Sequence, residues 1–130
     1  MMARIVLNPS LLQSILSVVI LASAIQADAA EPAWIRHTID KSSRGADGIR
    51  LADANGDGRL DLATGWEEGG VVRVYLQPDK SLVKKPWPSV TVGQVKSAED
   101  AILVDLDGDG ALDVVSSCEG GTKTIFFHFA

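Results

Sequence analysis

The sequence predicts an all-β fold in which one unit of about 50 residues occurs twice. Two acidic loops, residues 53–61 and 105–113, begin 52 residues apart and share one arrangement of aspartates and glycines. Segments rich in β-forming residues lie on both sides of each loop, and beyond residue 30 no segment shows the apolar period of a helix. Each acidic loop is therefore expected to connect two strands.

The first 30 residues, 1–30, are predicted to be a secretory signal peptide. Arg4 precedes an apolar run over residues 11–24, and small residues follow at 27–30. Polar side chains interrupt the run, so it is too short and too polar to span a bilayer, which needs about 20 apolar residues. We expect cleavage after Ala29 or Ala30, no stable membrane insertion afterwards, and a secreted, periplasmic or cell-surface location. The alternative is an uncleaved membrane anchor.

The strands of the two units are predicted in matched pairs. One strand leads into each acidic loop, a short strand follows it, a third comes after a Gly-Gly pair that signals a hairpin, and a fourth extended segment precedes the next unit. In chain order these segments are residues 34–39, 46–53, 62–64, 71–76, 87–92, 98–105, 114–116 and 122–129. The mature chain, residues 31–130, would thus hold one repeat at about 33–85 and a second, incomplete one at about 86–130.

A four-stranded unit with this period is typical of a β-propeller blade or a related stacked β-array. The chain would form a partial β-propeller of about two four-stranded blades, whereas closed propellers have about 4 to 8. Since the order of strands begins and ends within a blade, we expect residues 33–39 to complete a final blade and the chain to be the N-terminal piece of a longer propeller. The alternatives are an oligomer and an open sheet. An exposed edge carrying Phe126, Phe127 and Phe129 would favour the oligomer.

Each acidic loop places oxygen-bearing side chains at its positions 1, 3, 5 and 9, where they can converge on one hard cation. Glycine at position 6 allows the positive φ that turns the backbone around the ion, and leucine at position 8 is expected to anchor the loop in the apolar interior. A flexible cage of many oxygens suits Ca²⁺ better than Mg²⁺. Position 12, Thr64 or Ser116, lacks the glutamate of an EF-hand. The alternative is a solvated turn rich in Asp and Gly.

The pattern Asp-x-Asn/Asp-x-Asp-Gly-x-Leu-Asp, followed by a short strand and Gly-Gly, resembles the FG-GAP or VCBS-type repeats of secreted bacterial proteins and of the integrin α-subunit propeller. The resemblance covers about residues 33–130. Because Phe-Gly-Gly-Ala-Pro is absent, the bacterial branch fits better. The resemblance implies two Ca²⁺ sites, with the carbonyls of Arg59 and Ala111 as additional ligands. The implied side-chain ligands are Asp53, Asn55, Asp57 and Asp61 in one site and Asp105, Asp107, Asp109 and Asp113 in the other.

The second loop has four carboxylates and the first has three, so the second is expected to bind calcium more tightly. The formal net charge of −5 argues against nucleic acids and anionic membrane surfaces as partners. Two divalent ions would neutralise much of the acidity of the loops. Cys118 is the only cysteine, so no intrachain disulfide is possible and calcium would take the place of covalent cross-links.

The sequence favours a non-catalytic, calcium-stabilised extracellular module for adhesion or for interaction with a carbohydrate or protein, because metal binding accounts for the clustered polar groups. The alternative, by the same resemblance, is the N-terminal propeller fragment of a secreted carbohydrate-active lyase or dehydratase. His37 and His128 have no evident partner, and the common catalytic motifs are absent. Trp66, which precedes two glutamates, is predicted to be a surface contact, whereas Trp34 and Trp87 occupy equivalent repeat positions and are predicted to pack.

Overall fold

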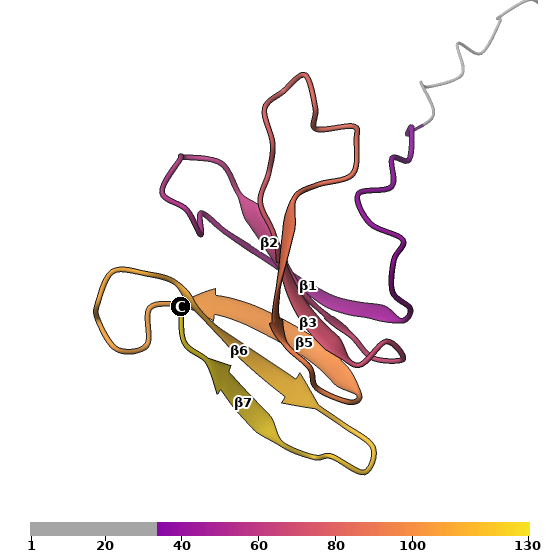
Figure 1. The fold of residues 1–130 in the computed structure, drawn as a ribbon, viewed down its shortest axis with the longest axis vertical. Helices are drawn as coiled ribbons and strands as arrows, with labels where there is room; N and C mark the ends of the chain where they lie inside the picture. The colour runs from indigo at the N-terminus through magenta and orange to yellow at the C-terminus, as the bar shows by residue number, and fades with distance from the viewer. Residues whose placement is uncertain (1–33) are drawn as a thin grey trace, which may run out of the picture. The chain divides into compact units, whose positions relative to one another are not determined.

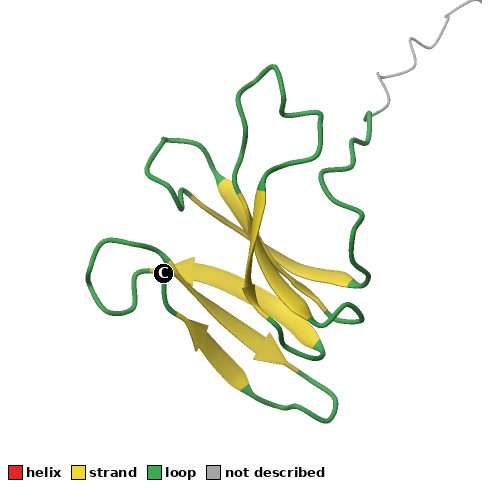
Figure 2. Ribbon diagram, viewed as in Figure 1, coloured by secondary structure: helices red, strands yellow, loops and turns green. Residues whose placement is uncertain are grey.

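The computed structural model describes residues 34–130, so the predicted signal peptide lies outside the described residues. In this part of the chain the fold consists of strands and loops without a helix (Figures 1 and 2). Seven strands follow one another: β1 (Ala46–Ala52), β2 (Asp61–Trp66), β3 (Val71–Tyr75), β4 (Ser89–Gly93), β5 (Ala98–Val104), β6 (Asp113–Cys118) and β7 (Ile125–His128). The all-β prediction is confirmed. The same residues include no helix with the length and apolar character that a membrane crossing requires.

Two antiparallel sheets make up residues 36–130, which form one compact unit. The first sheet has the order β1-β2-β3-β4, and the second has the order β5-β6-β7. The glycine pairs that predicted hairpins lie in the turns between β2 and β3 and between β6 and β7. Gly70 and Gly120 adopt φ values of 68° and 60° there, which glycine tolerates without strain. The two sheets do not close into a propeller within the described residues.

The predicted strand at residues 33–39 is wrong for the part that the structure describes, because residues 34–39 form no strand. The matching later segment becomes β4 because β3 offers it a free edge. No strand precedes the earlier segment in the described chain, so that segment has no hairpin partner. Its end is held instead by a backbone hydrogen bond in which the Trp87 N–H donates to the Ile39 carbonyl at 3.0 Å.

The apolar core lies between the two sheets. Its buried members are Ala63, Val72 and Val74 from the first sheet, Val95 from the linker, and Ala98, Ala101, Val114 and Cys118 from the second sheet. A Cβ atom on Gly65 would lie 2.5 Å from the Ala98 carbonyl oxygen, so β2 and β5 approach as closely as glycine permits. Cys118 is buried, and burial raises the pKa of its thiol.

A polar network lies on the other face of the first sheet, centred on Tyr75. The Tyr75 hydroxyl donates to Asp40 Oδ2 at 2.6 Å and accepts from Trp66 Nε1 at 2.9 Å, while Arg73 Nη1 donates to Asp40 Oδ2 at 2.7 Å. Burial and the bond to Asp40 raise the pKa of Tyr75 to about 12. Trp66 is only 7% exposed, so its predicted surface role is wrong. Glu67 and Glu68 lie in the turn between β2 and β3, so their polarity does not indicate that Trp66 is exposed.

Asp40→Asn is expected to lower the free energy of unfolding at pH 7 by about 1.5 to 3 kcal/mol, the usual contribution of hydrogen bonds to a charged group. Burial raises the pKa of Asp40, but hydrogen bonds from Tyr75, Ser42 and Arg73 outweigh burial and hold that pKa well below its usual range. A lowered folded-state pKa gives stability that is present above about pH 4 and is lost as the pH falls below that value.

Urea unfolding of wild type and Asp40→Asn at pH 7 and at about pH 2.5 measures this effect, because the difference between the two proteins should shrink in acid. Asp79→Asn, at an exposed carboxylate, is the control and should change little. A difference of the same size at both pH values would contradict the assignment.

Candidate functional site

The first acidic loop is closed by a buried aspartate at its ninth position. Asp61 is 0% exposed. Its Oδ2 accepts a hydrogen bond from the Ala54 N–H at 2.9 Å, and its Oδ1 accepts one from the Gln77 N–H at 2.7 Å. Ala54 is the second residue of the loop, and Gln77 lies just beyond β3. One carboxylate therefore fastens the start of the loop to its end and to the third strand.

The second acidic loop repeats this arrangement. Asp113 is 2% exposed, and its carboxylate accepts from the Leu106 N–H at 3.0 Å and from the Ala130 N–H at 2.9 Å. Figure 1 shows the C-terminus beside this loop, and shows that both loops project from the same side of the two sheets. The two loops are structural equivalents, as their spacing in the sequence predicted.

The leucine at position 8 does not hold the first loop in the core. Leu60 is 55% exposed, and Leu112 is half-buried. The predicted leucine anchor is therefore wrong for the first loop. The next residue, Asp61 or Asp113, takes that role because a carboxylate that accepts two backbone N–H bonds can be buried without an unpaired charge-bearing oxygen.

The aspartate at position 1 organises the turn of each loop. Asp53 Oδ2 accepts from the Gly58 N–H at 2.8 Å, and Asp105 Oδ2 accepts from the Gly110 N–H at 3.1 Å. Gly58 and Gly110 have φ values of 81° and 93°, the left-handed conformation predicted for position 6. The carboxylate at position 1 is thereby held over the turn in both loops.

The side chains at positions 1, 3 and 5 come together in both loops. In the second loop one carboxylate oxygen each from Asp105, Asp107 and Asp109 lies within 4.8 Å of the others, and all three residues are exposed. In the first loop the Asp57 N–H donates to Asp53 Oδ1 at 3.0 Å and to Asn55 Oδ1 at 3.1 Å, which draws the three residues together. The cluster in the second loop could hold a metal ion.

The side chain of Arg59 distinguishes the first loop from the second. Its guanidinium pairs with Asp57, and its Nε donates to the Gln77 carbonyl at 2.9 Å. The Arg59 backbone N–H is the main cause that lowers the pKa of Asp57; partial burial opposes it, and Asn55 and the guanidinium add to the lowering. Ala111 occupies the same position in the second loop and carries no charge. The carbonyls of Arg59 and Ala111 stay predicted ligands.

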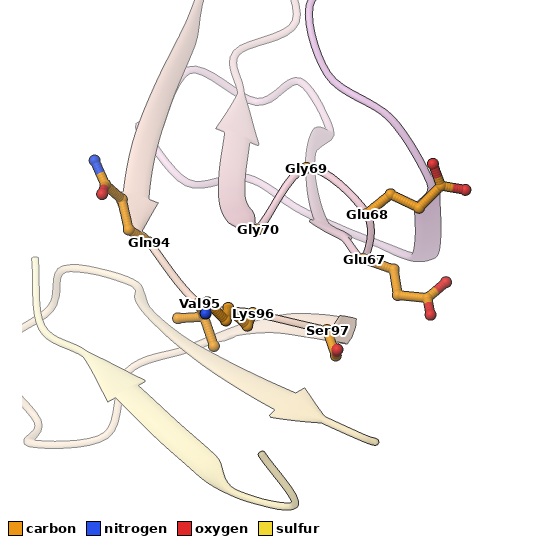
Figure 3. A pocket seen from close by; sticks show the side chains of 8 residues that line it. All are labelled: Glu67, Glu68, Gly69, Gly70, Gln94, Val95, Lys96 and Ser97. Carbon is orange, nitrogen blue, oxygen red and sulfur yellow. The ribbon is translucent and has the colours of Figure 1, made fainter. Parts of the chain in front are cut away.

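A second acidic cluster lies at the junction of the two sheets, where sequence reasoning placed no site. Carboxylate oxygens of Asp47 in β1, Glu67 after β2 and Glu99 in β5 lie within 4.8 Å of one another. Figure 3 shows Glu67 on the β2–β3 turn, which lines a cavity of about 570 Å³ together with the segment 94–97. Asp47 and Glu99 are 52 residues apart, so the repeat itself was a signal that they are equivalent.

The carboxyl group of Glu99 is the least satisfied member of this junction cluster. Its Oε1 is buried and has no hydrogen-bond partner among the described residues. Desolvation, and then the charges of Glu119, Glu67 and Asp47, raise the pKa of Glu99. None of the ion pairs found in residues 34–130 includes Glu99. Because no positive charge offsets it, the negative charge of Glu99 opposes the packing of the two sheets.

Two antiparallel sheets, each with the same acidic loop between its first two strands, define a β-repeat protein with paired candidate cation sites. Residues 53–116 match the family described as FG-GAP-like repeat, a span that runs from the first loop into β6 and includes both loops. Comparisons with curated proteins and with solved structures found no match. The match over residues 53–116 supports an FG-GAP-type repeat in this chain.

Asp113→Ala is expected to lower the free energy of unfolding by about 2 to 4 kcal/mol even in EDTA, because two backbone N–H groups lose a charged acceptor. Asp107→Ala, in the same loop but exposed, is the matched control and is expected to change stability by no more than about 0.5 kcal/mol. Chemical denaturation of both variants measures the difference. Equal losses would show that the buried aspartate has no special part in the loop.

Glu99→Gln is expected to raise the melting temperature at pH 7 in EDTA. A carboxyl group whose folded-state pKa is raised costs no stability below its unfolded pKa and destabilises progressively as the pH rises above it. The gain should therefore be small at about pH 4 and larger at pH 7. Glu68→Gln, at an exposed residue 3.9 Å from Arg44, is the control. Loss of stability at pH 7, or a gain that does not depend on pH, would refute this account of Glu99.

Proposed function

We propose that the chain is a secreted, non-catalytic calcium-binding module of the β-propeller repeat type, which serves adhesion or recognition of a carbohydrate or protein outside the cell. Each sheet acts as a blade, the first with four strands and the second with three. The match to FG-GAP-like repeats supports the propeller-type architecture. The apolar run near the N-terminus supports export.

The observation that carries the proposal is the cluster of Asp105, Asp107 and Asp109 in a loop whose backbone is already fixed. Calcium takes six to eight oxygen ligands in flexible geometry, which suits several carboxylates that approach from one short loop. Asp113 stays in the ligand set that we propose, because a carboxylate oxygen that accepts one N–H retains a second lone pair. The carbonyl of Ala111 would add a further oxygen.

The first loop would hold a second ion through Asp53, Asn55, Asp57 and Asp61, with the carbonyl of Arg59. The guanidinium of Arg59 already pairs with Asp57, so a cation must compete with it for that carboxylate. Asn55 also supplies a neutral oxygen where the second loop has a charged one. Both differences weaken the first site relative to the second.

Calcium would stabilise this module in place of disulfides. Kd values of about 10⁻⁴ to 10⁻³ M are usual for extracellular modules, where the ion is abundant. An ion at about 100 times its Kd stabilises the folded state by about 2.7 kcal/mol per site. With a single cysteine, Cys118, buried in the core, the chain has no covalent alternative.

Asp109→Ala is expected to remove more of the calcium-dependent rise in melting temperature than Asp57→Ala, because the second site binds the ion more tightly. Exchanging residues between the loops tests whether Asn55 and Arg59 are the cause of the weaker binding in the first loop. Asn55→Asp with Arg59→Ala gives the first loop the charges of the second and should tighten its site by about tenfold, close to 1.4 kcal/mol. Asp107→Asn should weaken the second site.

Calorimetric titration of each protein with Ca²⁺, repeated in the presence of Mg²⁺ as a competitor, measures these affinities. Equal losses for Asp109→Ala and Asp57→Ala would contradict the ranking of the sites. Heat and melting curves that do not respond to Ca²⁺ would refute the proposed function, and Mg²⁺ that binds as tightly as Ca²⁺ would refute the choice of metal.

A further inference from the structure

The interface between the two sheets shows which face each sheet uses for stacking. In the first sheet Arg50, Ala63 and Val74 lie directly opposite one another on neighbouring strands, so their side chains share one face. Ala63 is 0% exposed and Val74 is 7% exposed, because the second sheet covers this face. We call it the covered face of the first sheet.

The second sheet packs on that covered face through β5, which contacts β1, β2 and β3. Ala101 and Leu103 of β5 belong to this packing: Ala101 is 1% exposed in the core, and Leu103 packs against the core. They alternate along the strand with Ile102, which therefore points to the opposite face. The inter-sheet contact thus joins the face of Ala63 to the face of Ala101.

The repeat of 52 residues places an equivalent of the covered face on the second sheet. Arg50 corresponds to Ile102, and Ala63 corresponds to Val115. Ile102 pairs with Val115, and Val115 pairs with Phe127, so the three form the same row across β5, β6 and β7. Here the row is open: Ile102 is 41% exposed and Phe127 is 60% exposed. The second sheet therefore presents, uncovered and apolar, the face that the first sheet buries.

The opposite half of the same contact is also exposed, on β1. Ile49 and Leu51 correspond to Ala101 and Leu103, the residues through which β5 packs. Ile49 is 55% exposed and Leu51 is 57% exposed. Ile39 and Asp40 line a cavity with Ile49 on this face, and Tyr75 and Trp66 are only 1% and 7% exposed, so the open part of the face is confined to β1. One molecule thus exposes on β1 the counterparts of the residues through which β5 packs.

We propose that the open row Ile102–Val115–Phe127 is a docking surface for β1 of a second copy of this chain, which stacks its first sheet there as the second sheet stacks on the first. The contact is head to tail, because the two halves are different surfaces. A heterologous contact of this kind yields rings when its rotation closes and filaments when it does not. The partner is a second copy because the repeat supplies a matching half on the same chain.

The charges at the contact between copies would differ from those at the internal contact. Arg50 pairs with Asp100 between the first and second sheets. At the contact between copies the corresponding positions are Ile102 and Gly48, so this ion pair has no counterpart there. The acidic junction cluster does have one, because Glu99 and Glu119 occupy the positions of Asp47 and Glu67 and would face Asp47 of the second copy. Apolar contacts alone would drive it, at roughly 25 cal/mol for each Å² of apolar surface removed from water.

The test is the mass of the full chain by sedimentation over a series of concentrations, with folding checked by β-sheet circular dichroism. Wild type is expected to exceed the monomer mass as concentration rises. Phe127→Asp blocks one half and Leu51→Asp blocks the other, so each variant alone is expected to stay monomeric. Leu82→Asp, at a 53% exposed leucine on neither face, is the control and should associate like wild type.

An equimolar mixture of Phe127→Asp and Leu51→Asp gives the sharpest outcome. Each variant keeps the half that the other has lost, so the mixture is expected to form a 1:1 dimer that does not grow further. If either aspartate variant unfolds, Ile102→Ser and Ile49→Ser replace the pair. Wild type that is monomeric at every concentration, a mixture that stays monomeric, or association lost only in Phe127→Asp would overturn the proposal.

Discussion

The arrangement of each sheet depends on a buried carboxylate at the end of its acidic loop. Asp61 binds the start of the loop and the chain just after β3, and Asp113 makes the equivalent two contacts in the second sheet. An isolated buried charge would be costly, but two backbone N–H donors compensate each of these carboxylates. The loop frame therefore belongs to the fold. The same frame holds the exposed carboxylates of Asp105, Asp107 and Asp109 where they could serve an ion.

The two sheets pack closely because the residues between them are small. Gly65 lets β2 and β5 approach closely, and the core between them is built mainly from alanine and valine. The carboxylates of Asp47, Glu67 and Glu99 gather at the end of this contact and oppose it. The stability of such stacked repeats is approximately the sum of the stabilities of the units and of the contacts between neighbours.

Local signals in the sequence predicted the strands, the Gly-Gly hairpins and the glycine conformations in the loops, because each depends on residues close together in the chain. Features that depend on residues far apart in the chain could not be predicted from the sequence. Residues 34–39 resemble the segment of β4 but have no preceding strand to pair with. Trp66 is buried and its Nε1 donates to the Tyr75 hydroxyl, and Leu60 is exposed because Asp61 takes its expected place. The carboxylates of the junction cluster come from three separate elements. The only sign of the cluster in the sequence is that Asp47 and Glu99 occupy equivalent positions of the repeat.

Amide hydrogen exchange of the full chain in EDTA, resolved residue by residue by NMR, tests most directly whether the loop frame is independent of the ion. The Ala54, Gln77 and Leu106 amides donate to the buried aspartates and should exchange slowly without calcium. Slow exchange at these amides, with little further protection when calcium is added, is the result that we expect. Exchange as fast as in exposed loops, with protection only after calcium is added, would show that the ion builds the frame and would contradict this account.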